Sequence, residues 1–152
     1  MLSANCYSAG SSSNNDTTTT KKNNYERAVS FINEAKKLEQ NGKQKKADKQ
    51  YEKAQKLLIK SNNNNPNNAN TLNYLGFTTR KLGNFNLGEK YYLQGLAIEP
   101  EHIGINEYLG ELYVVTNRMN LARERLEILR NCNCEEFQEL KEIIEGIKKS
   151  KY

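Results

Sequence analysis

Part of this chain can be laid over the stretch that follows it, because matching residues recur 34 positions apart. The matches run through most of one period: Leu75 with Leu109, Gly76 with Gly110, Thr79 with Tyr113, Gly88 with Ala122, and Tyr92 with Leu126. A period of this length indicates a unit of two helices that cannot bury its apolar face alone and must stack on its neighbours. The sequence therefore predicts an all-α fold, an α-solenoid whose function comes from a stacked surface.

The stretch from Ala69 to Pro100 carries the most complete version of the pattern. It reads A-x2-L-x2-LG-x2-T-x2-LG-x-F-x2-G-x3-Y-x2-GL-x3-P and resembles the tetratricopeptide repeat. The resemblance implies a right-handed α-solenoid of three helix–turn–helix repeats, with small residues where packed helices approach closely. It also implies a concave groove lined by the first helix of each repeat.

The repeat phase divides the chain into six segments. The first repeat matches the second at an offset of 41 residues, which is one period plus seven inserted residues, and the insertion is rich in asparagine. The predicted segments are a disordered Ser/Thr/Asn-rich tail at 1–24, repeat one at 25–61, an Asn-rich loop at 62–68, repeat two at 69–102, repeat three at 103–136, and an end helix at 137–150. The end helix is expected to keep the stack soluble through its charged outer face.

The beginning of the sequence leaves two interpretations of location open. The opening MLSANCYSAG has small residues before a cleavage point after Ala9, but it has no basic segment and no full apolar segment before them. It is either a truncated export signal, which predicts a periplasmic or secreted protein, or the polar tail of a cytoplasmic one. From about Tyr25 to the end, the order LGFTTRKLG, LAIEPEHIGINEYLGELYV and EEFQELKE is similar to short exported bacterial tetratricopeptide proteins, which implies a bacterial, periplasmic setting.

Catalytic motifs are absent from the sequence. The chain has one histidine, His102, and lacks the glycine-rich, serine-centred and metal-binding motifs that assemble common active sites. We expect His102 to be a helix N-terminal residue, and we expect no enzyme activity, no cofactor and no metal.

Two cysteines, Cys132 and Cys134, are separated by one residue in the predicted turn before the end helix. In an oxidising compartment they can form a small disulfide or pair between chains, whereas in a reducing compartment they are thiols. A structural or incidental role is the main interpretation. Thiol exchange is the alternative, and it is the only enzymatic function that the sequence leaves open.

The charge is unevenly distributed. Lys21 to Lys60 holds twelve basic and five acidic residues, whereas Glu101 to Tyr152 holds eight basic and ten acidic ones. The Lys-rich first repeat offers two alternatives to a solvated face: electrostatic binding of nucleic acid or of an anionic membrane surface, and head-to-tail self-association with the acidic end. No aromatic residues alternate with these lysines to stack bases, so contact with nucleic acid or a membrane is disfavoured.

The groove is the predicted binding site. Positions that line the groove in tetratricopeptide arrays map onto amides, an aromatic ring and charged side chains, which suit a peptide backbone and acidic or basic side chains. The predicted groove residues are Lys36, Asn70, Asn73, Phe77, Arg80, Lys81, Glu107 and Glu111. The lysine and asparagine pattern that clamps a C-terminal carboxylate in one subclass is missing. We therefore expect a non-catalytic adaptor that binds a peptide or protein segment of a partner whose identity the sequence does not give.

Overall fold

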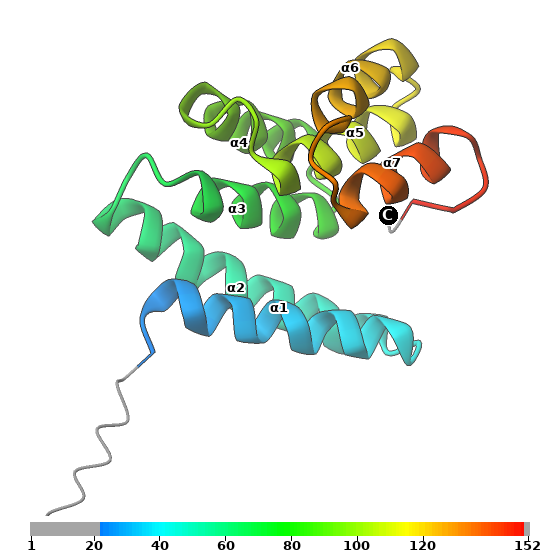
Figure 1. Cartoon of the computed structure of the whole chain (residues 1–152). Helices are drawn as coiled ribbons and strands as arrows, with labels where there is room; N and C mark the ends of the chain where they lie inside the picture. Colours follow the sequence, from blue (N-terminus) through cyan, green and yellow to red (C-terminus); the bar gives the residue numbers. More distant parts are fainter. Residues whose placement is uncertain (1–21, 151–152) are drawn as a thin grey trace, which may run out of the picture.

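The computed structural model describes residues 22–150, and within this range it contains seven α-helices and no strand (Figure 1). The predicted all-α fold is confirmed. The helices are α1 (Asn24–Gln40), α2 (Gln44–Asn64), α3 (Ala69–Lys81), α4 (Phe85–Ile98), α5 (Ile103–Val115), α6 (Met119–Leu129) and α7 (Glu135–Ile144). Each helix of the described range is too short or too polar to span a bilayer.

The helices form a stack of hairpins. α1 packs on α2, α3 on α4 and α5 on α6, while α2 also contacts α3 and α4 contacts α5. α7 packs against both α5 and α6, so that it covers the last hairpin (Figure 1). The first helices of successive hairpins, α1, α3 and α5, touch one another and form one face of the stack.

Asparagine side chains start several of these helices. Asn23 forms a capping box with Glu26, in which its side chain accepts from the Glu26 amide at 2.9 Å and its own amide donates to the Glu26 carboxylate at 3.0 Å. Asn68 and Asn84 cap α3 and α4 by accepting from backbone amides three residues on. Such caps satisfy amides that have no partner within the helix. The predicted tail at 1–24 therefore ends earlier than expected, and its residues 1–21 lie outside the described range.

The predicted loop at 62–68 is shorter than the sequence suggested. α2 continues to Asn64, and only residues 65–68 are non-helical. Leu57 and Leu58 anchor the end of α2 in the core, and the helix runs on to Asn64, two residues before Pro66. A proline disfavours the helical conformation in the residue before it, and Asn65 is accordingly non-helical.

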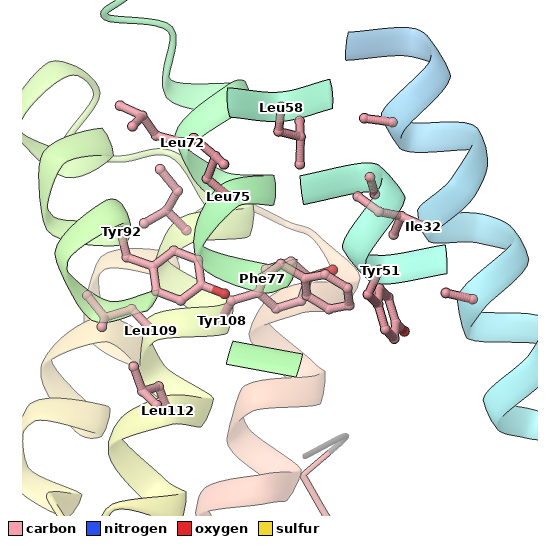
Figure 2. Close-up of a cluster of buried hydrophobic side chains, with 14 of the residues drawn as sticks. Ile32, Tyr51, Leu58, Leu72, Leu75, Phe77, Tyr92, Tyr108, Leu109 and Leu112 are labelled. Carbon is pink, nitrogen blue, oxygen red and sulfur yellow. The ribbon is translucent and has the colours of Figure 1, made fainter. Parts of the chain in front are cut away.

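The core is continuous along the stack rather than gathered at one centre. It runs from Ile32 on α1 through α3 to Leu112 on α5, and buried tyrosines supply much of its bulk (Figure 2). The repeat landmarks Leu75 and Leu109 are both fully buried. Gly76 lies so close to the ring of Tyr92 that an added Cβ would sit 2.4 Å from a ring carbon, which explains a glycine at this landmark.

The end helix is displaced from its predicted bounds of 137–150. It begins at Glu135 and ends at Ile144, because Gly146 adopts a left-handed backbone with φ +73°. The Gly146 amide donates to the Ile143 carbonyl, and the Ile147 amide donates to the Glu142 carbonyl at 2.9 Å. These bonds form a Schellman motif, which ends a helix and reverses the chain. Ile147, which lies within the predicted bounds of this helix, follows its end and is 73% exposed.

Candidate functional site

A group of aromatic rings occupies the centre of the face made by α1, α3 and α5. The Phe77 ring centroid lies 5.0 Å from that of Tyr108 and 5.8 Å from that of Tyr51 (Figure 2). The Lys36 ammonium lies 4.8 Å from the centroid of the Phe77 ring and 3.5 Å from the Tyr108 hydroxyl. A cation over an aromatic ring is held by the negative face of the ring. We call Lys36, Phe77 and Tyr108 the aromatic platform.

A buried charged pair lies beside the platform. Arg80 on α3 donates to the backbone carbonyl of Tyr108, and its second terminal nitrogen lies 3.3 Å from the Glu111 carboxylate. Both side chains are fully buried. Removing either partner of such a pair leaves an isolated charge away from water, which is strongly unfavourable. Arg80 therefore joins α3 to α5 and fixes the position of the platform.

A second ion pair closes the side of the face nearest the first hairpin. Lys81 on α3 lies 2.8 Å from the Glu39 carboxylate on α1, and Tyr51 donates its hydroxyl to the same carboxylate at 2.9 Å. Burial, together with the nearby Glu39 charge, raises the pKa of Tyr51. Burial also raises the pKa of Tyr108. Both phenols are neutral at physiological pH, so the local charges are those of lysine, arginine and glutamate.

The N-terminal ends of α3 and α5 carry a separate polar group. The Nδ1 atom of His102 accepts from the Ile105 amide at 3.2 Å, so the neutral ring carries its proton on Nε2, which donates to the Asn70 side-chain oxygen at 3.1 Å. Burial lowers the pKa of His102, which favours this neutral form. The prediction that His102 is a helix N-terminal residue is confirmed. Asn73 is buried nearby, and among the described residues its side-chain oxygen has no hydrogen-bond partner.

The structure thus divides the predicted groove residues between two places. Lys36, Phe77, Arg80, Lys81 and Glu111 come together, with Glu107 one helical turn before Glu111, whereas Asn70 and Asn73 lie at the other end of α3. Five of the eight are buried rather than exposed on an open wall: Asn73, Phe77, Arg80, Glu107 and Glu111. All eight residues lie on the first helices α1, α3 and α5, and that they line a binding groove stays a prediction.

Tyr108 and Ser150 were not among the predicted groove residues. Tyr108 lies one period after Tyr74, so the repeat itself marked an aromatic position on that face. The Ser150 hydroxyl lies 3.2 Å from the Glu111 carboxylate, and nothing in the sequence pattern indicates this contact.

Cys132 and Cys134 form a disulfide in the turn between α6 and α7, with their Cα atoms 5.2 Å apart. Of the alternatives that the sequence left open, the structure has the intrachain disulfide. Within residues 22–150, no three metal-ligating side chains come together.

No family model and no curated protein sequence matches the chain. Among solved structures, it is similar to the Yersinia enterocolitica type III secretion translocator chaperone SycD. The TM-score is 0.56 at 18% sequence identity, over 78% of this chain and 81% of the chaperone. At this identity the likeness shows the fold, which is that of a helical-repeat protein.

Proposed function

We propose that the chain is a tetratricopeptide-type adaptor that binds a peptide segment of another protein on the face made by α1, α3 and α5. The observation that carries the proposal is the aromatic platform, where three helices bring rings and charged side chains together. Aromatic and cationic side chains are common in the residues that dominate binding energy at protein interfaces. Side chains that are already packed also lose little conformational freedom on binding. The likeness to a secretion chaperone supports a protein partner.

The platform suits a segment that carries an acidic side chain or a carboxylate group. Lys36 supplies the charge and is only partly buried, whereas Phe77 and Tyr108 are covered within the fold. Lys36 is therefore the platform residue that can contact a partner while the packing of Phe77 and Tyr108 in the core stays unchanged. This mechanism is complementarity of shape and charge, and it involves no chemical step.

Capture experiments with two adjacent lysines test the proposal. Lys36 lies over the Phe77 ring, whereas Lys37 is exposed about 100° further around the helix, so Lys36→Ala and Lys37→Ala differ in position but not in chemistry. We expect crosslinked partners from the native organism to be lost with Lys36→Ala and retained with Lys37→Ala. Equal capture by both variants, with unchanged circular dichroism, would contradict the proposal.

The exposed lysines of α2 favour one alternative, electrostatic binding of nucleic acid. They lie on the side of the first hairpin away from the platform: Lys45, Lys46, Lys49, Lys53, Lys56 and Lys60. Binding of this kind weakens steeply as salt increases. A gel shift with random duplex DNA at low and physiological salt separates the two functions, since platform binding does not require these lysines.

A further inference from the structure

The chain after α7 turns back toward the face that we propose as the binding site. The Schellman motif at Gly146 reverses the backbone, and the amides of Ile147 and Lys148 both donate to the Glu142 carbonyl, at 2.9 and 3.1 Å. These bonds give the segment 147–150 a defined start. It does not simply continue the axis of α7 into solvent (Figure 1).

Two acidic side chains, on α7 and α5, contact the segment 147–150. The Lys148 ammonium lies 2.7 Å from the Glu139 carboxylate on α7, and the Ser150 hydroxyl lies 3.2 Å from the Glu111 carboxylate on α5. Glu139 precedes Leu140 and Glu111 follows Gly110, and these two apolar neighbours are in direct contact. We call Glu111 and Glu139 the acidic end of the face.

The acidic end is continuous with the aromatic platform. The Glu111 oxygen that lies nearest Ser150 also lies 3.3 Å from Arg80, which in turn donates to the backbone carbonyl of Tyr108 in the platform. A segment bound at the acidic end is therefore two side chains away from Phe77 and Lys36. A partner that spans the whole face must share this space with residues 147–150.

We propose that the acidic end binds a short segment with a lysine and a hydroxyl side chain two positions later, and that residues 147–150 are its intramolecular occupant. The inference rests on the proposed function, because it gives that site a built-in competitor. A tethered segment has an effective concentration on the order of 1 mM. If this effective concentration exceeds the dissociation constant of the free segment about tenfold, the tether weakens any competitor about tenfold.

The full-length chain allows a matched test. Lys148→Glu reverses the charge that meets Glu139, whereas Lys149→Glu makes the same change at an exposed neighbour. The probe is a fluorescein-labelled synthetic peptide of residues 145–152, measured by fluorescence polarisation. We expect it to bind the Lys148→Glu protein about tenfold more tightly than the wild-type or Lys149→Glu protein.

Amide hydrogen exchange gives a second measurement that does not depend on the peptide. The Ile147 and Lys148 amides should be protected in the wild-type and Lys149→Glu proteins, and protection of Lys148 should fall in Lys148→Glu. Equal peptide affinity in all three proteins, or unprotected amides in the wild type, would overturn the proposal. So would protection that rises with protein concentration, because the occupant would then be a second copy of the chain.

The two proposals fail separately. If the segment does not occupy the acidic end, partner capture through Lys36 can still succeed. If the segment does occupy it but neither the wild-type nor the Lys148→Glu protein captures a partner through Lys36, the adaptor function fails and the intramolecular contact remains.

Discussion

Replacement of Arg80 by methionine tests whether the platform is held by a buried charge. Arg80 and Glu111 are both fully buried, so the Arg80→Met substitution leaves the Glu111 carboxylate in the interior without its guanidinium. The loss of one partner of a buried pair costs about 3–5 kcal/mol of unfolding free energy. A domain of this size has roughly 5–15 kcal/mol in total, so the variant should fold marginally.

A surface pair of the same residue types provides the control. Arg118 and Glu89 are joined by two hydrogen bonds of 2.8 Å, but their side chains are 36% and 20% exposed. Because water screens this pair, Arg118→Met should cost about 1 kcal/mol or less. Urea unfolding followed by circular dichroism at 222 nm measures both variants on the same scale.

The double variant Arg80→Met with Glu111→Gln decides the cause. A neutral amide at 111 removes the stranded charge, so the double variant should be more stable than the sum of the single losses predicts, by about 0.5–3 kcal/mol. If the losses simply add, or if Arg118→Met costs as much as Arg80→Met, burial of the charge is not what makes Arg80 important.

Three further outcomes follow from the packing, the helix ends and the turn. Gly76→Ala should lower the unfolding free energy by about 1 kcal/mol more than Gly110→Ala in urea titrations, because the first meets the rigid, buried Tyr92 ring and the second meets the movable methyl groups of Leu140. Because the folded-state pKa of His102 is lowered, the contribution of its neutral ring to the unfolding free energy is complete above the unfolded pKa of about 6.5 and declines as pH falls toward the folded pKa. His102→Asn should keep the helix cap and lose this pH dependence, as measured by urea unfolding between pH 5 and 8. Reduction of the Cys132 disulfide with dithiothreitol should lower the unfolding free energy by only about 1–2 kcal/mol, because it closes a very short loop; complete unfolding on reduction would contradict this.

The repeat period was sufficient to predict the helices and much of the core. Leu75 and Leu109 are buried alike, and Gly76 lies under a ring, because a stacked unit requires the same apolar and small residues at each step. The ends of helices were less predictable. Asn62 to Asn64 have the composition of a loop, but the buried leucines before them anchor a helix that ends only at Asn64, just before the Asn65–Pro66 pair.

The burial of charged residues could not be predicted from the period. Arg80 occupies a position that faces the groove in an ideal repeat, but the backbone of Tyr108 and the carboxylate of Glu111 approach it from α5. Such an approach depends on the distance between two hairpins, which no local pattern encodes. The same is true of Ser150, whose position depends on the reversal at Gly146.

The backbones of the helices in residues 22–150 approach only helices within two places along the chain, whereas the Lys36 side chain reaches from α1 to Tyr108 on α5. In a stack joined mainly by near neighbours, each joint between hairpins can bend slightly without breaking the others. Small rotations between hairpins therefore add up along the stack. The curvature of the face made by α1, α3 and α5 can adjust to a ligand in this way while every helix stays intact.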